Sequence, residues 1–571
     1  MELVAERLDS IIVLAIFAVS FNLLSGYSGQ LSVAHAAFGA VGGYTLARLF
    51  LSDGTQFLLG AGIGIVFAAV VALVIGAVAL RLSSEWLMLM TFAVGVVVVS
   101  LATTSSSLGG TYGLLGITGL SVFGHKLDTP EQMLPVFAII GVLVYAICHR
   151  LGESPFGRVL RGIREDELAA RSLGKNASAY KLLVFVITGA MAGLAGELMV
   201  VQTTVASPTL FDLALATVIV SAVVIGGSGN LVGSVLAAAL IVMSTPFLES
   251  VLSLSPTTAS LWQLVLYGTA LIVVLFVRPE GLLPEGFNPL RRTPAVDRGA
   301  VPEPTLAAVR PEAPPAPEQG LPILEVSGLS KRFGSIVAAD DLDFTLTEGA
   351  ISAVVGPNGA GKTTLFNLLT GTIPPDAGSV RLRGEEVVGL GPDRVARLGM
   401  VRSFQDVRIF PRLSVLDNVV LGVPEQPGER VGPLFGRPRR VRAREREARE
   451  LAHRWLEFVG LDQLAAAKAH DLGFGQQKLI SFARVLATEA PVLLLDEPAS
   501  GIDVRWLEQI VELIHRARAE GRTICIVEHN LEVVENVADD VAFMELGRIT
   551  ARGSFAELTS EAHLAEAYFG G

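Results

Sequence analysis

The sequence predicts a multi-domain protein in which an all-α polytopic membrane domain precedes an α/β domain. Residues 1–278 are predominantly apolar and contain only twelve Lys and Arg and fourteen Asp and Glu. From residue 323 onward, charged residues are frequent, and short apolar runs alternate with helical stretches, as in an α/β fold. We therefore expect a membrane domain at 1–278, a linker at 279–322 and an α/β domain at 323–571.

The membrane domain is predicted from recurring apolar runs. A spanning helix needs about 20 residues, so we expect about eight to ten helices, some of them broken. The glycine-rich stretch 105–121 predicts a non-helical excursion, which must be buried in protein or face water. The N-terminus MELVAERLDS is acidic where a signal peptide is basic, so we expect no cleaved leader. The runs lie at 10–24, 33–50, 58–80, 86–104, 134–150, 181–203, 214–228, 231–250 and 262–277.

The distribution of Lys and Arg predicts how the membrane domain is oriented. Six of the twelve Lys and Arg of the first 278 residues lie at 158–181, which predicts a cytoplasmic loop there. The last membrane segment then also ends inside, and the N-terminus lies outside. The segment 158–174 predicts an amphipathic helix carrying Arg158, Arg161, Arg164 and Asp166. It either couples the membrane domain to the α/β domain, which we favour, or is only a cationic topology anchor.

Composition also predicts the state of the linker, and it argues against a nucleic-acid-binding protein and against a disulfide-stabilised one. The linker holds eleven of the 28 prolines and predicts an extended, disordered tether. The net charge of −11 argues against a nucleic-acid-binding protein. Cys148 and Cys525 are the only cysteines, so no disulfide framework is expected.

The loop 356–364, GPNGAGKTT, predicts a phosphate-binding P-loop. Its glycines let consecutive N–H groups point towards phosphates, and it lies between the strand ISAVV and an apolar helical run. We expect Lys362 to reach the β- and γ-phosphates of ATP, Thr363 to ligate Mg²⁺ and Thr364 to bond near the α-phosphate. The remaining expected phosphate-binding residues are Gly356, Pro357, Asn358, Gly359, Ala360 and Gly361.

A second motif, VLLLDEP, begins at residue 492 and supplies the carboxylates. Four apolar residues predict a buried strand that ends at Asp496, which we expect beside Mg²⁺. Glu497 follows and is placed to act as general base on the attacking water. Two acids directly after a buried strand are costly without a partner cation, which favours a functional role.

These residues resemble the ATP-binding subunits of ABC transporters over all of 323–571. The resemblance implies an α/β P-loop ABC ATPase fold with a helical subdomain. It implies that Phe333 stacks on adenine, although an ordinary core aromatic is the alternative, and that Gln405 senses Mg²⁺. LGFGQ then occupies the signature position, with Gly473, Gly475 and Gln476. Asp503 occupies the D-loop and His529 is the switch histidine.

The signature departs from the family pattern at one position. A serine is common where this chain has Gly473, and its hydroxyl would reach the γ-phosphate held by the opposite subunit. Losing one hydrogen bond to a charged group costs roughly 1.5–3 kcal/mol, so we expect a weakened but active site. The backbone N–H groups of Gly473 and Gly475 remain as donors.

The first half is similar to the permease subunits of branched-chain, or hydrophobic, amino acid uptake systems. The resemblance rests on GYSGQLSVAHAAFGAVGGYT, SPFGRVLRGIREDELAARSLG, KLLVFVITGAMAGLAGEL and VIGGSGNLVGSVLAAAL. Glu197 lies in an apolar helix, where a carboxylate either faces the transport pathway or bonds a neighbouring helix. The pattern GAMAG at 189–193 predicts close helix packing.

Together the resemblances imply one half of an ATP-driven importer in the inner or plasma membrane, with its ATPase domain in the cytoplasm. Its implied partners are a second permease–ATPase half, different from or identical to this one, an extracytoplasmic substrate-binding protein and membrane lipid. Alternative cargoes are urea, short amides or aromatic acids. An exporter or an ATP-gated regulator is the alternative class, whereas a soluble ATPase acting on nucleic acid is excluded by the apolar first half.

Overall fold

The computed structural model describes residues 2–53, 56–117, 120–122, 125–251, 255–287, 320–501 and 504–560. The chain forms two compact units. The membrane unit comprises Met1–Arg164 and Ser178–Thr293, and the ATPase unit comprises Glu165–Ala177 and Pro294–Gly571. Most of the predicted linker, 288–319, lies outside the described residues.

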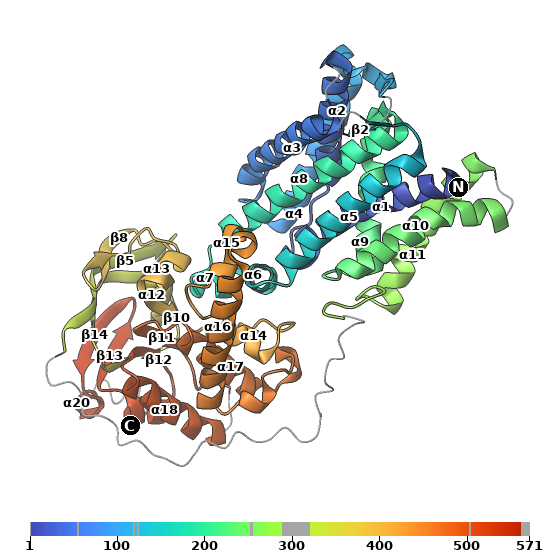
Figure 1. Cartoon of the computed structure of the whole chain (residues 1–571). Helices are drawn as coiled ribbons and strands as arrows, with labels where there is room; N and C mark the ends of the chain where they lie inside the picture. Colours follow the sequence, from blue (N-terminus) through green and yellow to red (C-terminus); the bar gives the residue numbers. More distant parts are fainter. Residues whose placement is uncertain are drawn as a thin grey trace. The chain divides into compact units, whose positions relative to one another are not determined.

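The membrane unit is a bundle of long helices, drawn from blue to green in Figure 1. Among the described residues, seven helices are long and apolar enough to cross a membrane. These seven are fewer than the expected eight to ten; α2 and α11, of 19 and 22 residues, are also long but are not among the seven. The helices are α1 (Glu2–Asn22), α2 (His35–Asp53), α3 (Phe57–Ala79), α4 (Ser84–Thr104), α5 (Pro130–Gly152), α6 (Pro155–Glu165), α8 (Ala177–Thr203), α9 (Leu213–Gly226), α10 (Leu231–Val251) and α11 (Pro256–Val277).

Small residues bring α8 against α2 and α3. A Cβ on Gly196 would lie 2.0 Å from the carbonyl oxygen of Gly39, so these two backbones are in direct contact. A Cβ on Gly193 would lie 2.6 Å from the Cβ of Ala68, on α3. The close packing predicted from GAMAG is confirmed, since only glycine fits at such approaches.

Glu197 lies in the same region. Its side chain is fully buried, and one oxygen would lie 2.1 Å from a Cβ placed on Gly64 of α3. Neither oxygen has a hydrogen-bond partner among the described residues. The expected bond to a neighbouring helix is therefore not found in this part of the chain.

An apolar cavity of about 430 Å³ lies among α1, α5 and α10. Ile12, Val142 and Val232 are among the residues that line it. α1 and α5 still pack closely beside this pocket, since a Cβ on Gly141 would lie 2.8 Å from Cγ2 of Ile12.

Asn22, at the end of α1, holds the turn between α9 and α10. Its Nδ2 donates to the carbonyl oxygens of Gly227 and Asn230 and to Oγ of Ser234, and its Oδ1 accepts from the N–H of Gly229. A buried amide with its bonds satisfied fixes this turn of VIGGSGN firmly.

The predicted non-helical excursion is confirmed. Residues 106–112 form two 3₁₀ turns, and β1 (Leu114–Leu115) pairs antiparallel with β4 (Val205–Ala206). A two-stranded pair also joins β2 (Leu120–Val122) to β3 (His125–Leu127).

The beginning of the predicted tether is ordered, which corrects the linker boundary. The N–H of Leu282 donates to the carbonyl oxygen of Ile225 at 2.8 Å, and Glu285 forms an ion pair with Arg164 at 2.9 Å. Residues 279–287 therefore belong to the membrane unit. The composition of the segment could not predict this order, because backbone hydrogen bonds to a turn far away in the sequence do not depend on residue type.

The ATPase unit contains a six-stranded sheet of order β10-β11-β12-β7-β13-β14 and a four-stranded antiparallel sheet of order β6-β5-β8-β9. Every residue of β7, β11 and β12 is buried, as expected for central strands covered on both faces. The strands are β5 (Pro322–Phe333), β6 (Ile336–Thr347), β7 (Ile351–Val355), β8 (Ala377–Leu382), β9 (Glu385–Glu386), β10 (Met400–Arg402), β11 (Val492–Asp496), β12 (Thr523–Val527), β13 (Asp540–Glu545) and β14 (Arg548–Gly553).

Helices complete the ATPase unit, and the orange group α14, α16 and α17 in Figure 1 forms the predicted helical subdomain. Its apolar faces share one buried core with β11 and β12. The helices are α7 (Glu167–Ser172), α12 (Lys362–Leu369), α13 (Pro392–Leu398), α14 (Val415–Val420), α15 (Val431–Gly436), α16 (Pro438–Phe458), α17 (Phe474–Leu486), α18 (Val504–Ala519), α19 (Leu531–Val537) and α20 (Phe555–Ser560).

Candidate functional site

The predicted site residues lie at one edge of the six-stranded sheet. β10, β11, β12 and β7 run parallel, so their carboxyl ends meet at this edge. The P-loop follows β7, and Asp496 ends β11. Such an edge is where α/β sheets bind ligands.

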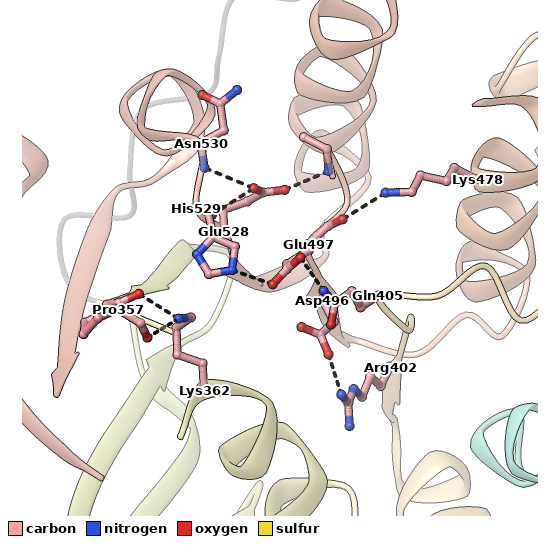
Figure 2. A network of polar contacts seen from close by, with 12 residues as sticks. Pro357, Lys362, Arg402, Gln405, Lys478, Asp496, Glu497, Glu528, His529 and Asn530 are labelled. Carbon is pink, nitrogen blue, oxygen red and sulfur yellow. Dashed lines mark hydrogen bonds and ion pairs between the residues drawn. The ribbon is translucent and has the colours of Figure 1, made fainter. Parts of the chain in front are cut away.

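The backbone of the P-loop requires glycine at two positions. Gly359 and Gly361 have φ of +83° and +105°, the left-handed region that favours glycine. A Cβ on Gly361 would lie 2.3 Å from the carbonyl oxygen of Ala338, so only glycine fits there. Lys362 donates to the carbonyl oxygens of Gly356 and Pro357 at 2.7 and 2.9 Å (Figure 2). Burial lowers the pKa of Lys362.

Asp496 is completely buried and pairs with Arg402, at the end of β10. Burial raises the pKa of Asp496, and the neighbouring guanidinium opposes that shift. One carboxylate oxygen, Oδ1, is buried without a hydrogen-bond partner among the described residues. Thr363 is exposed at the start of α12. A free carboxylate oxygen and a hydroxyl are oxygen ligands of the kind that Mg²⁺ prefers, so these residues fit the ion.

Glu497 is the centre of a short chain of side chains. Its Oε1 lies 2.6 Å from Nε2 of His529, and its Oε2 accepts from Nε2 of Gln405 at 2.7 Å (Figure 2). Its φ is +46°, an unusual value for a non-glycine residue. The structure thus brings together Gln405, Glu497 and His529, which lie far apart in the sequence.

Two further polar residues at this edge were not singled out from the sequence. Glu528 is buried and accepts from the N–H groups of Ala499, His529 and Asn530. Lys478 of α17 donates to the carbonyl oxygens of Glu497 and Pro498 at 3.1 and 3.3 Å. The signal for Glu528 was present, because it follows the buried strand β12 as Asp496 and Glu497 follow theirs.

The signature segment LGFGQ begins α17. The N–H of Gly473 donates to Oε1 of Gln476 at 3.2 Å, so one of the two expected backbone donors already has a partner. A Cβ on Gly475 would lie 2.9 Å from the indole of Trp506. Among the described residues no hydrogen bond joins this segment to the P-loop.

Phe333 remains apart from this group. Phe333, at the end of β5, is 45% exposed, which excludes the alternative of a core aromatic. Nζ of Lys331 lies 5.6 Å from its ring centroid. Asp503 lies outside the described residues.

The segment that follows α6 belongs to the ATPase unit. Asp166 forms an ion pair with Arg408 at 2.9 Å, and Glu165 accepts from the N–H of Arg412 at 3.1 Å. Farther along, Lys175 forms an ion pair with Glu429 at 2.6 Å. The bonds of Glu165, Asp166 and Lys175 thus lie within the ATPase unit, whereas Arg164 binds within the membrane unit.

Comparison with known proteins agrees with both halves of this architecture. Residues 4–275 match the family described as the branched-chain amino acid transport system permease component, and residues 339–500 match the ABC transporter family. The branched-chain amino acid transport ATP-binding protein BraF of Pseudomonas aeruginosa is 37% identical over 251 residues, which cover 44% of this chain and 98% of BraF. LivG of Escherichia coli is 34% identical over 250 residues and covers 44% of this chain and 98% of LivG.

A solved nucleotide-free ATP-binding cassette from an ABC transporter is also similar, with 31% identity, a TM-score of 0.39 and coverage of 44% of this chain and 100% of that one. The matches to the two families and to BraF show that the ATPase unit is an ATP-binding and ATP-hydrolysing transporter cassette and that the chain is a multi-pass inner-membrane protein whose cassette is cytoplasmic. The chain belongs to the branched-chain amino acid family of ABC transporters and carries the permease and the ATP-binding subunit of that family in one polypeptide.

Proposed function

We propose that this chain is one half of an importer that moves branched-chain or other hydrophobic amino acids, delivered by a separate extracytoplasmic binding protein. The observation that carries the proposal is the ion pair between Asp166 and Arg408. Asp166 lies within the stretch that matches the permease family, yet it binds the ATPase unit. A permease segment held by the cassette is what a transporter needs for ATP hydrolysis to drive movement of cargo.

The contacts of this segment support a coupling role over that of a topology anchor alone. Arg408 lies three residues after Gln405, which bonds to Glu497. The guanidinium carbons of Arg402 and Arg408 each lie 5.2 Å from the ring centroid of Phe404. A movement of the Glu497 carboxylate can therefore be transmitted to Asp166 through a few packed side chains.

For ATP binding, we assign Lys362 and the N–H groups of the loop 356–361 to the phosphates, Thr364 to the α-phosphate region and Phe333 to the adenine. The ring of Phe333 is exposed, as a stacking platform must be. Thr363, Asp496 and Gln405 are assigned to Mg²⁺, which neutralises phosphate charge when bound. The partnerless Oδ1 of Asp496 supports its assignment.

For hydrolysis, we assign Glu497 as the general base that takes a proton from the attacking water. Its bonds to His529 and Gln405 orient the carboxylate from both sides. His529 and Gln405 then act as switches, since moving either one changes how Glu497 is held.

The ATP site is completed by another subunit. The signature residues Gly473, Gly475 and Gln476, with Asp503, are assigned to the ATP held by the opposite cassette. We favour a non-identical second permease–ATPase half over a homodimer. We also propose the permease domain at 1–287, extended from 278 by the ordered residues, and the cassette at 323–571.

The test is uptake by proteoliposomes. The full chain, purified with its native partners, is reconstituted, and ATPase activity is measured with and without the binding protein and leucine. An importer shows stimulation by the loaded binding protein and ATP-dependent accumulation of leucine. ATPase activity that is the same with and without the binding protein, or ATP-driven efflux, would identify an exporter. Accumulation of urea, short amides or aromatic acids in place of leucine would reassign the cargo.

A further inference from the structure

Arg402 is a buried cation held from several sides. Its side chain is 3% exposed and the carboxylate of Asp496 is fully buried. Nη2 donates to Oδ2 of Asp496, and Nη1 donates to Oδ1 of Asn367. Asn367 lies on α12, the helix that begins with Lys362, so Arg402 links the P-loop helix to the end of β11.

Two aromatic rings restrict the guanidinium further. Its carbon lies 5.6 Å from the ring centroid of Phe366 and 5.2 Å from that of Phe404. A guanidinium close to two rings and with both of its amino groups bonded has little rotational freedom, and its planar fork is what a lysine cannot reproduce.

The carboxylate of Asp496 is held through one oxygen. Oδ2 accepts from Arg402, whereas Oδ1 has no partner among the described residues. The N–H of Asp496 donates to Oγ of Ser403, which fixes the backbone at the same point. Residues that bond the second oxygen of a metal-ligating carboxylate orient the ligand, and their loss weakens metal binding.

We propose that Arg402 is the positioning residue of the metal site: it holds Oδ2 of Asp496 so that Oδ1 faces the Mg²⁺ that accompanies ATP. The inference rests on the proposed assignment of Asp496 to Mg²⁺. It goes beyond charge neutralisation, because a cation that only balanced the carboxylate would need neither the bond to Asn367 nor the two flanking rings.

The experiment measures nucleotide binding without turnover. The full chain in detergent is titrated with a fluorescent ATP analogue at increasing Mg²⁺, which gives the Mg²⁺ concentration at half-saturation and the affinity without Mg²⁺. For Arg402→Met we expect the half-saturating Mg²⁺ to rise about tenfold or more, with affinity in EDTA unchanged. Arg402→Lys should show a smaller rise. Asn367→Ala keeps the ion pair but frees the guanidinium, and it should also show a rise.

Arg484→Met is the matched control. Arg484 is also a buried arginine of the ATPase unit, with its guanidinium 4.8 Å from the ring centroid of Phe410. Its replacement should leave the Mg²⁺ dependence as in the wild type. If Arg402→Met does not fold, Arg402→Lys and Asn367→Ala decide the question. A half-saturating Mg²⁺ that is unchanged or lower in the Arg402 and Asn367 variants would overturn the proposal.

Asp496→Asn separates this inference from the proposed function. If Asp496→Asn binds nucleotide with the Mg²⁺ dependence of the wild type, the assignment of Asp496 to Mg²⁺ is wrong, and the role of Arg402 falls with it. If Asp496→Asn loses that dependence but the Arg402 variants retain it, only the positioning role is wrong.

Discussion

Oδ2 of Asp166 lies 2.9 Å from Nη1 of Arg408, an ion pair within the ATPase unit whose acidic member comes from the stretch that matches the permease family. Both side chains are partly exposed, so the pair adds little to stability. Reversing one charge places like charges together and should reduce the stimulation of ATPase activity by the loaded binding protein severalfold. We expect this in Asp166→Arg and in Arg408→Asp, with recovery in the double variant. ATPase assays in proteoliposomes measure it, and a double variant no better than either single one would argue against a direct pair.

Gly473→Ser should raise ATPase activity. The φ of Gly473 is −67°, which any residue adopts, and only Oε1 of Gln476, at 4.0 Å, lies near an added Cβ. A hydroxyl that reaches the opposite γ-phosphate contributes roughly 1.5–3 kcal/mol, about tenfold or more in rate. Steady-state ATPase assays test this. Unchanged activity would show that the missing hydroxyl does not limit the site.

Gly475→Ala provides the contrast within the same segment. Its Cβ would lie 2.9 Å from the indole of Trp506, closer than real contacts allow. We expect lower thermal stability, by about 1–3 kcal/mol from overpacking, and no gain in activity. Thermal unfolding with and without nucleotide measures it. A stable Gly475→Ala would show that Trp506 moves freely.

Glu497→Gln should abolish hydrolysis while ATP binding persists. The amide keeps the shape but cannot take a proton, so turnover should fall by about 10²–10⁴. The affinity for the fluorescent ATP analogue should stay close to that of the wild type, since Lys362 and the loop are unchanged. Residual turnover near the wild-type value would move the role of general base to another group.

Glu197→Met should stabilise the membrane unit. The carboxylate is buried and has no hydrogen-bond partner among the described residues, an arrangement that costs free energy unless it is paired. An apolar side chain of similar length removes that cost, so the unfolding temperature in detergent should rise while leucine uptake is retained. Loss of uptake in a stable variant would instead place Glu197 in the transport pathway.

Glu528 gives the cassette a pH-dependent stability. Burial raises the pKa of Glu528 above its usual value of 4.5, against the opposing bonds from Ala499, Asn530 and His529. Between the two pKa values the folded state binds more protons than the unfolded state, so stability falls as the pH rises through this window. Relative to Glu528→Gln, the wild type should lose stability from pH 4.5 upward and then level off. Unfolding measured across that range tests it, and parallel curves would contradict it.

Local sequence patterns predicted the elements that carry the site. The strands ISAVV and VLLLD are β7 and β11 at the expected residues, because a central strand is apolar at every position. Side chains that contact the site from distant parts of the sequence could not be predicted in the same way. Arg402 lies 94 residues from Asp496, and its role depends on β10 pairing in parallel with β11. The half-exposed strands of the four-stranded sheet also lack a continuous apolar run.

The order of residues 279–287 escaped prediction for a related reason. Prolines and glycines there are typical of a tether, yet the segment is held by backbone bonds to the end of α9 and by the ion pair of Glu285 with Arg164. Such contacts depend on where a distant turn lies, which composition does not report.

The direct backbone contact of α2 with α8 restricts how the permease can move. Side chains adjust their rotamers to let helices slide or tilt, but two backbones that touch at Gly39 and Gly196 have nothing between them to rearrange. We expect α2 and α8 to move together as one rigid body. Relative motion within the membrane then belongs to helix pairs that meet through side chains rather than through backbone.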